Sequence, residues 1–392
     1  MGRNRPKGGL LGGSDILRTP DAPEVSGTGG ADSIDVVFTD PSDVGGGSIT
    51  SRTASATDSG GTTTTATGTG TTVTISSLSI GSFTVGGFVT NDFGNSVASA
   101  TVSVEVLFDR SVWFGGHDAA SDNRIDYAAL ASTGNATDFG DLTGGKIESA
   151  YGGAASSTRG VVGATASNAL QYITFASTGN TTDFGDRTVS LTFFAGLSNS
   201  TRGVFGGGSS DSNVMDYITI ASTGNATDFG DLSQGRKQPS ASASSTRGIF
   251  AGGESSNSKV NTIDYITIAS TGNATDFGNL TAVKDKTAST SSSTRSLIMG
   301  GLAPSNTNVI EYITIASTGN GTDFGDLSQN VREGGGNNNN VRAVHGGGNA
   351  SGYTNVIDFV TIASTGNASD FGDLTDARGG MMYCSSNHGG LH

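Results

Sequence analysis

A module of 45 to 48 residues is repeated six times after residue 110 of this 392-residue chain. Its most constant string, Ser-Thr-Gly-Asn, starts at Ser132, Ser177, Ser222, Ser270, Ser317 and Ser364. In known repeat architectures, a period of roughly 40 to 50 residues supplies one four-stranded blade of a β-propeller. The period therefore predicts that most of the chain folds as a ring of blades.

Each copy reads as four strands. In the fourth copy, residues 261–270 alternate apolar and polar side chains of the β-branched and aromatic types that favour strands. The Gly and Asn of the following turn tolerate positive φ and lead into a second strand, residues 274–280. Upstream, residues 247–253 read as a short buried strand that ends in glycines, and residues 238–245 as a strand of small residues. Small side chains suit the crowded axis of a propeller.

The partial copies predict how the ring closes. The first copy, residues 110–142, lacks its small strand, and residues 376–387 read as a small strand without a blade of its own. We expect the strand near residues 381–385 to pair with residues 111–116, which gives six blades and no open sheet edge.

The order of the strands resembles the kelch repeat. The resemblance depends on a glycine doublet, a tyrosine and a third aromatic position in each copy. The doublets are Gly115-Gly116, Gly207-Gly208, Gly252-Gly253, Gly300-Gly301 and Gly346-Gly347, with Gly163-Ala164 as the departure. The tyrosine position holds Tyr127, Tyr172, Tyr217, Tyr265, Tyr312 and Phe359. Phe139, Phe184, Phe229, Phe277, Phe324 and Phe371 stand where kelch repeats carry tryptophan. The resemblance implies a six-bladed kelch-like β-propeller over residues 108–392.

Residues 20–107 contain no copy of the repeat. With 62 glycines and only 14% charged residues, the chain is poor in helix formers, so we expect an all-β protein. This segment resembles a fibronectin type III module, with Phe38 in place of the usual core tryptophan and Phe83 in place of the corner tyrosine. The resemblance implies a small β-sandwich that acts as a spacer.

The first 19 residues read as a basic, Gly-rich docking arm. Residues 1–18 carry four Arg or Lys and one Asp, a balance of +3, which leaves −14 − 3 = −17 for the remainder. We expect Arg3, Arg5 and Lys7 to meet acidic groups of a partner subunit, and Leu10 and Leu11 to fill an apolar groove. An acidic body repels phosphate, so we expect no nucleic-acid partner.

Cysteine content and hydropathy predict the cellular compartment in which the chain folds. The single cysteine, Cys384, allows no internal disulfide, which fits assembly in a reducing cytoplasm. No apolar run approaches the ~18 residues of a membrane helix, so we expect no membrane insertion. The N-terminus has too short an apolar core for a signal peptide.

Several motifs imitate functional sites. The six turn asparagines lie in glycosylation sequons, but we expect them to shape the turn. Paired acids such as Asp138 and Asp141 could hold calcium; hydrogen bonding in a turn, or pairing with the repeat arginine, is the alternative. The histidines, the one cysteine and Trp113 match neither the copper ligands of galactose oxidase-type rings nor sialidase boxes. We therefore expect no enzyme, cofactor or metal, although two carboxylates brought together in space would suffice for a glycosidase.

Comparison of the six copies separates a constant part from a varied one. The Tyr and Asp-Phe-Gly strands hardly change, whereas the loops after the glycine doublet differ in every copy. In kelch-type rings these loops share a face with the connections between blades. Diversified loops on a constant scaffold are typical of recognition sites. The candidate partner-binding residues are Asp118, Asn213, Asn257, Asn306 and Tyr353.

The near-identical Ser-Thr-Gly-Asn and Asp-Phe-Gly repeat, the fibronectin-like module and the Gly/Ser/Thr-rich composition together resemble virion structural proteins of tailed bacteriophages of marine bacteria and cyanobacteria. The resemblance implies a tail, neck or fibre-associated protein, assembled in the bacterial cytoplasm within an oligomeric particle. It would bind neighbouring virion proteins through the arm, and host surface glycan or protein through the ring. A bacterial surface adhesin is the alternative, and a carbohydrate-active enzyme a more distant one.

Overall fold

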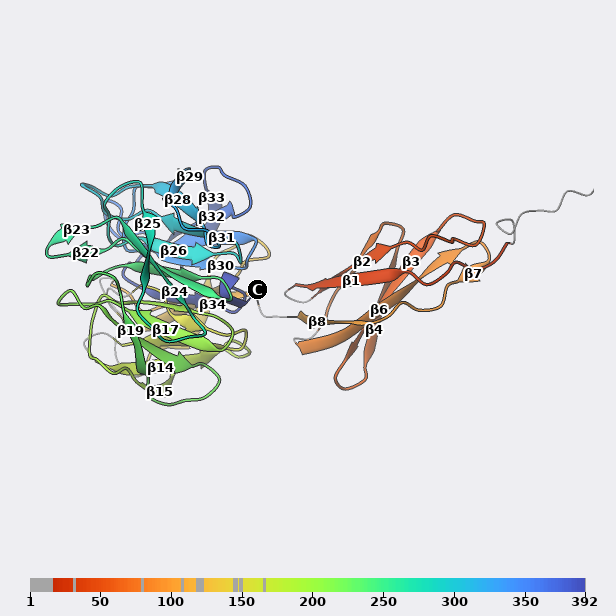
Figure 1. The fold of residues 1–392 in the computed structure, drawn as a ribbon, viewed down its shortest axis with the longest axis horizontal. Coiled ribbons are helices and arrows are strands. Elements are labelled where there is room, and N and C mark those ends of the chain that lie inside the picture. The colour runs from red at the N-terminus through yellow and green to blue at the C-terminus, as the bar shows by residue number, and fades with distance from the viewer. Residues whose placement is uncertain are drawn as a thin grey trace, which may run out of the picture. The chain divides into compact units, whose positions relative to one another are not determined.

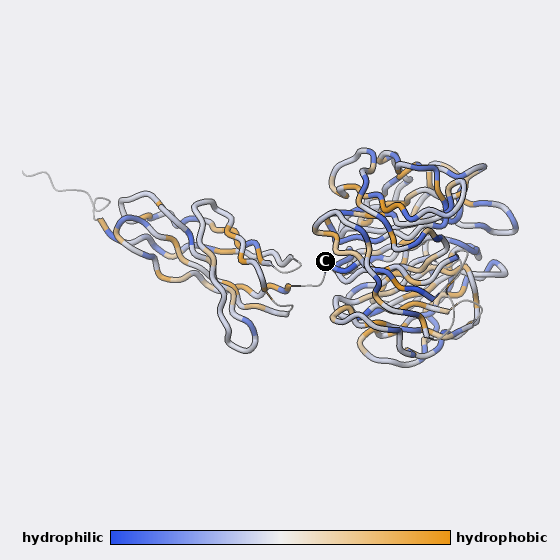
Figure 2. The backbone as a smooth tube through the Cα atoms, turned by 180° about the vertical axis from the view of Figure 1, so that it is seen from behind, coloured by the Kyte–Doolittle hydropathy of each residue, from blue (hydrophilic) through white to orange (hydrophobic). Residues whose placement is uncertain are grey.

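A computed structural model describes residues 17–391, apart from 31–32, 79–80, 107–108, 118–122, 144–146, 148–150 and 165–166. The described chain is all-β, as expected, and its one helix is the short 3-10 turn η1 (Gly389–Leu391) (Figure 1). Short apolar and polar stretches alternate along both parts of the chain (Figure 2). No described helix is long and apolar enough to cross a lipid bilayer. The chain folds as two compact units, Met1–Phe108 and Asp109–His392.

Two antiparallel sheets share one apolar core in the first unit. One sheet contains β1 (Glu24–Gly29), β2 (Ile34–Thr39) and β5 (Thr72–Ile75). The other contains β3 (Ser51–Asp58), β4 (Thr63–Gly68), β6 (Gly81–Asn91), β7 (Gly94–Asn95) and β8 (Val102–Val106). Every second residue of β2 is buried, because alternate side chains of a strand point to opposite faces. Phe38 from the first sheet and Phe83 from the second belong to the same buried cluster.

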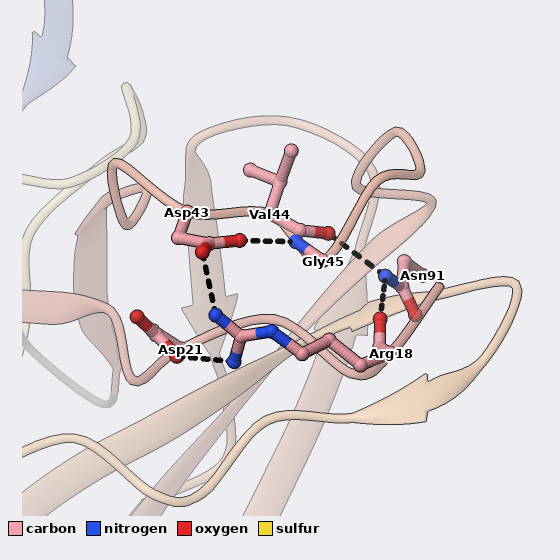
Figure 3. A network of polar contacts seen from close by, with 6 residues as sticks. All are labelled: Arg18, Asp21, Asp43, Val44, Gly45 and Asn91. Carbon is pink, nitrogen blue, oxygen red and sulfur yellow. Dashed lines mark hydrogen bonds and ion pairs between the residues drawn. The ribbon is translucent and has the colours of Figure 1, made fainter. Parts of the chain in front are cut away.

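A polar network fixes the start of the first unit (Figure 3). Arg18 donates to Asp21 at 3.0 Å and forms an ion pair with Asp43, while Asp43 also accepts the N–H of Gly45 at 2.8 Å. The Asn91 amide donates to the carbonyls of Arg18 and Val44 at 2.9 and 2.8 Å. These bonds attach the segment before β1 to the loop after β2 and to the end of β6.

The second unit contains six four-stranded antiparallel sheets, which we number in chain order. Sheet 1 comprises β34 (Met382–Ser385), β9 (Arg110–Phe114), β10 (Arg124–Ala129) and β11 (Thr137–Asp141). Sheet 2 comprises β12 (Ala154–Ala155), β13 (Arg159–Gly163), β14 (Ala169–Thr174) and β15 (Thr182–Asp186). Sheet 3 comprises β16 (Ala195–Ser198), β17 (Arg202–Gly206), β18 (Val214–Thr219) and β19 (Thr227–Asp231). Sheet 4 comprises β20 (Ser240–Ala243), β21 (Arg247–Ala251), β24 (Thr262–Thr267) and β25 (Thr275–Asn279), with a side hairpin of β22 (Glu254–Ser255) and β23 (Ser258–Lys259). Sheet 5 comprises β26 (Ala288–Ser291), β27 (Arg295–Met299), β28 (Val309–Thr314) and β29 (Thr322–Asp326). Sheet 6 comprises β30 (Gly335–Asn338), β31 (Arg342–Gly346), β32 (Val356–Thr361) and β33 (Ser369–Asp373).

The first strands of the six sheets pack against one another. β12 contacts β16, β16 contacts β20, β20 contacts β26, β26 contacts β30, β30 contacts β34, and β34 contacts β12. These strands are buried at every residue and consist largely of Ala, Gly, Ser, Thr and Asn. Small side chains let these strands approach each other closely. The exception is β34, expected to be a small strand, which places the larger Met382 and Tyr383 among them.

The repeat arginine joins each sheet to the next. In sheet 4 the guanidinium carbon of Arg247 lies 4.4 Å from the ring centre of Tyr265, and its Nη1 donates to the carbonyl of Ile315 in sheet 5 at 2.7 Å. The same bond runs from Arg110 to Phe175, Arg159 to Ile220, Arg202 to Ile268, Arg295 to Ile362 and Arg342 to Leu130. Because Leu130 belongs to sheet 1, the series returns to its start. These arginines thus bond backbone carbonyls, which differs from the arginine–aspartate pairing that was one alternative for the paired acids.

The Ser-Thr-Gly-Asn turn forms a second set of hydrogen bonds between the same neighbouring sheets. Asn273 accepts the backbone N–H of Asp231 in the preceding sheet at 3.0 Å, and the N–H of Gly272 donates to the Phe229 carbonyl at 2.7 Å. The equivalent asparagine bonds are Asn180 with Asp141, Asn225 with Asp186, Asn320 with Asn279, Asn367 with Asp326 and Asn135 with Asp373. These asparagines were expected to shape their own turn, but none of them has a positive φ and each side chain accepts a hydrogen bond from the preceding sheet instead.

The C-terminal strand completes sheet 1. Met382–Ser385 pairs antiparallel with β9, with Ser385 opposite Ser111 and Met382 opposite Phe114. This is the pairing that the partial copies predict. Trp113 is fully buried there and donates from its indole to the Gly335 carbonyl of sheet 6 at 3.1 Å.

The glycine doublet needs one correction. In the sixth copy it is Gly347-Gly348, one residue later than the sequence comparison placed it. Their φ angles of +64° and +109° match those of Gly252 and Gly253, +63° and +109°. Glycine adopts these left-handed values without strain, whereas Gly346 is the last residue of β31.

In five of the six sheets the third strand has a buried acid that receives a hydrogen bond or a cation from the connection before it, whereas sheet 2 has Gln171 at this position. Asp264, fully buried, accepts the Ser233 hydroxyl at 2.5 Å and lies 3.1 Å from Nη1 of the fully buried Arg236. Equivalent ion pairs join Arg187 to Asp216, Lys284 to Glu311 and Arg378 to Asp126. These charges lie beneath the connections between sheets and fix their paths.

Asp358 in sheet 6 lacks this cation, because the equivalent position in the preceding connection is the buried Val331. Its Oδ2 accepts both the N–H and the hydroxyl of Ser328, at 2.9 and 2.8 Å. Burial raises the pKa of Asp358 above its usual value.

This raised pKa predicts how stability depends on pH. The folded state binds the Asp358 proton more tightly than the unfolded chain, so the burial penalty is absent below the unfolded pKa of about 3.9, grows as pH rises above it, and is complete above the folded pKa. Asp358→Asn should therefore stabilise the protein at pH 7 by on the order of 1–3 kcal/mol, the cost of a buried carboxylate that has no cation and one oxygen without a hydrogen bond, and change nothing at pH 3. Urea unfolding at both pH values measures this. An equal gain in the free energy of unfolding at pH 3 and pH 7 would contradict this prediction. The control is Asp264→Asn, which should destabilise the protein because it removes the partner of a buried cation.

Candidate binding face

The varied loops and the connections between sheets meet at one end of the second unit, which we call the loop face. Isolated β-bridges join a connection to the loop after the glycine doublet in four places: Lys237 with Glu254, Asp285 with Leu302, Arg332 with Asn349, and His117 with Gly379. Antiparallel strands place these segments at one end, and the Ser-Thr-Gly-Asn turns at the other. The expected division into a varied face and a constant face therefore has a structural basis.

A cleft of about 670 Å³ opens on the loop face between sheets 5 and 6. Its lining is polar amide and hydroxyl groups, one guanidinium and a few small apolar side chains. The residues are Leu302, Pro304, Ser305, Asn306, Gln329, Asn330, Arg332, Ala350 and Ser351. Such a surface can hydrogen-bond to a polar partner at several points and carries one positive charge.

Asn306 supports the wall of this cleft. Its amide donates to the carbonyls of Asn349 and Ala350 at 2.9 and 2.8 Å, and its Oδ1 accepts from Arg332 at 3.2 Å. The predicted binding residue thus positions two neighbouring loops and orients the guanidinium.

Tyr353 occupies, in the loop of sheet 6, the position that Asn306 occupies in the loop of sheet 5. Each pairs across its own loop, Asn306 with Leu302 and Tyr353 with Asn349. Tyr353 is 42% exposed, which leaves an aromatic surface in the loop that contributes Ala350 and Ser351 to the cleft. Of the predicted residues, these two are the ones that the structure brings to neighbouring loops.

The other predicted residues lie elsewhere. Asn257 is exposed at the tip of the β22–β23 hairpin with φ +60°, where Ser256 donates its N–H to Asp211 at 2.8 Å. Asn213 is not in a varied position: its carbonyl accepts the N–H of Leu232, as Asn168, Asn261, Asn308 and Asn355 do in their copies. Asp118 lies outside the described residues.

Sequence comparison of the copies did not single out Arg332, Gln329 or Asn330. They occur in the connection before sheet 6; Gln329 recurs as Gln234 before sheet 4, whereas Asn330 and Arg332 correspond there to Gly235 and Lys237. Lys237 is the equivalent cation in the connection before sheet 4, so the sequence held no signal that set Arg332 apart.

The centre of the six first strands offers little space. The cavity there has about 50 Å³ and is lined mostly by Gly, Ala, Ser and Asn. Tyr383 reaches into it from β34, its hydroxyl accepts the N–H of Ser289 at 3.0 Å, and burial raises its pKa to about 12. His388 closes one end: Nδ1 accepts from Gly390 at 3.1 Å, so Nε2 carries the hydrogen and donates to the Ala155 carbonyl at 2.9 Å. That volume holds a few water molecules at most.

Metal-ligating groups do not gather in the described part of the chain. No three His, Cys, Asp or Glu side chains there lie close enough to hold one ion. The buried thiol of Cys384 has a pKa raised by burial, which keeps it protonated.

Comparison with known proteins adds no family. No protein-family model and no curated protein matches the chain. Among solved structures, that of YjhT aligns over 49% of this chain and 68% of its own, with a TM-score of 0.42 and 9% identity. A likeness of this strength assigns neither fold nor function.

Proposed function

We propose that residues 109–392 form a six-bladed, kelch-like β-propeller closed by β34, and that the first unit is a fibronectin type III-like sandwich. Three observations support the ring: the first strands contact one another in an unbroken series, and the arginine and asparagine bonds both return from sheet 6 to sheet 1. The sandwich is supported by two sheets that share Phe38 and Phe83 in one core.

We further propose that the protein is a bacteriophage virion structural protein of the tail, neck or fibre, whose propeller binds host surface or neighbouring virion subunits and performs no catalysis. The loop face carries this proposal: loops that differ in every copy surround a polar cleft of about 670 Å³ on an otherwise constant scaffold. The docking residues Arg3, Arg5, Lys7, Leu10 and Leu11 lie outside the described residues, so attachment through the arm stays a prediction.

Two side chains that line the cleft and one from a loop that forms its wall test this function. Changing Asn330, Arg332 and Tyr353 together to alanine should weaken binding at least tenfold, because a few polar and aromatic side chains carry most of the energy of an interface. Fluorescently labelled protein on intact cells of a susceptible bacterial strain measures adsorption, and recovery of the protein in purified particles measures assembly.

The matched control changes an exposed threonine of the first unit, Thr65→Ala, and should bind and assemble as the parent does. If the triple variant adsorbs to cells and enters particles like the parent protein, the loop face has no binding role. Absence of the unmodified protein from purified particles would contradict the virion assignment itself.

A further inference from the structure

The constant end of the second unit also contains pockets. One of about 180 Å³ lies between the Ser-Thr-Gly-Asn turn of sheet 2 and Phe139 of sheet 1, and one of about 170 Å³ lies between the turn of sheet 5 and Phe277 of sheet 4. The nine lining residues of each occupy the same nine positions of the repeat. The pocket is therefore a feature of the module and not of one loop.

The inter-sheet bonds explain only part of the constancy of this turn. They account for the asparagine, whose Oδ1 accepts from the neighbouring sheet, while the glycine is explained by its φ, +157° at Gly179 and +156° at Gly272. The turn itself is closed by backbone atoms, as from the N–H of Ser317 to the carbonyl of Thr314 at 3.2 Å. Folding thus places no evident demand on the serine and threonine side chains.

Yet the serine and threonine are identical and solvent-exposed in all six copies. The serines are those that begin the motif, and the threonines are Thr133, Thr178, Thr223, Thr271, Thr318 and Thr365. Exposed positions on the loop face differ in every copy. Recent duplication alone would have left both ends equally alike, so a constraint acts on the exposed residues at this end, which include the serine and the threonine.

The chemistry of the pocket indicates the ligand. In sheet 5 its polar groups are the side chains of Tyr312, Thr314, Ser317, Thr318 and Thr322, together with the amide of Asn320. All are uncharged donors and acceptors. The nearby guanidinium of Arg295 is held over the Tyr312 ring and bonded to the Ile362 carbonyl.

We propose that each complete pocket binds one unit of a neutral saccharide, so that a repeating polysaccharide is held at several points of the same protein. Turns 2 to 5 have the full set of side chains. The first copy has Ala129 in place of the threonine before the turn, and the sixth has Phe359 in place of tyrosine. We therefore infer four full sites and two weaker ones. This inference does not depend on the loop face or on a virion role.

Four exposed threonines test it together: Thr178→Ala, Thr223→Ala, Thr271→Ala and Thr318→Ala. The probe is an array of neutral oligosaccharides built from glucose, galactose, mannose and N-acetylglucosamine, with acidic oligosaccharides alongside. The parent protein should retain at least one neutral series, with about four monosaccharide equivalents per chain by titration. The fourfold variant should bind the corresponding polymer at least tenfold more weakly, because several linked sites act as one multivalent site.

A matched control removes exposed threonines from strand β4 of the first unit, Thr63→Ala, Thr65→Ala and Thr67→Ala, and should bind as the parent does. Circular dichroism melting should show that all variants fold. No retention of any neutral saccharide would overturn the proposal, as would parent-like binding by the fourfold variant. Saccharide binding that is lost in the Asn330, Arg332 and Tyr353 variant but kept in the fourfold variant would assign the ligand to the loop face and also overturn it.

Discussion

Ending the chain at Asp376 should give a protein that aggregates and shows no cooperative unfolding. The deletion removes β34 and exposes the edge of β9, an unpaired row of backbone groups that can pair with other chains. It also removes Met381, Met382 and Tyr383, all buried, and uncovers Trp113. At about 1.5–3 kcal/mol for each large buried side chain, the loss is comparable to the whole stability of a typical domain.

Size-exclusion chromatography and thermal unfolding measure this outcome. A control chain that ends at Asn387 keeps β34 and loses only η1 and the His388 contact, so it should remain soluble and melt close to the parent. A soluble, monomeric 1–376 chain with an unchanged melting transition would show that sheet 1 does not need its fourth strand.

Asp264→Ala should destabilise the protein by about 3–5 kcal/mol, the usual cost of removing one partner of a buried ion pair. Arg236 would stay fully buried with its charge uncompensated, and burial already lowers the pKa of this guanidinium. The N–H and hydroxyl of Ser233 would lose their acceptor as well. Urea unfolding of the purified protein measures the change.

Two matched variants separate charge from packing. Asp276→Ala removes the exposed aspartate of the same copy and should change the free energy of unfolding by less than about 0.5 kcal/mol. Adding Arg236→Met to Asp264→Ala should restore most of the loss, because a well-packed apolar pair replaces buried ions at little cost. A single Asp264→Ala variant within about 1 kcal/mol of the parent would contradict the role of the pair.

The sequence predicted the strands and the completion of sheet 1, because strand patterns and the count of partial copies are local properties. It did not predict the buried ion pairs. Arg236 and Asp264 are 28 residues apart and meet only because neighbouring sheets pack side by side. The sequence feature that could have indicated these pairs is an acid directly before the repeat tyrosine together with a cation in the preceding connection. Most copies have both, whereas the connection before sheet 6 has Val331 in place of the cation.

The candidate site was predicted less well. Asn213 was taken for a varied loop residue although the same position holds asparagine in every copy, where the backbone carbonyl supports the strand end. The polar side chain of Asn306 suggested partner contact, but it hydrogen-bonds to neighbouring loops of the same chain. Such contacts depend on how two loops fold against each other, which no repeat pattern encodes.

Closure of the six sheets by the C-terminal strand can be measured with one engineered disulfide. Ser111 and Ser385 lie directly opposite each other in sheet 1 and are both buried. Opposite residues of antiparallel strands have α-carbons about 4.5–5.5 Å apart, within the range that a disulfide spans. In a Cys384→Ala background, which removes the native thiol, Ser111→Cys and Ser385→Cys should form an intramolecular disulfide in the monomer, detected by mass spectrometry of a non-reduced digest. Two free thiols in the folded monomer, or a disulfide found only between chains, would contradict a ring closed by β34.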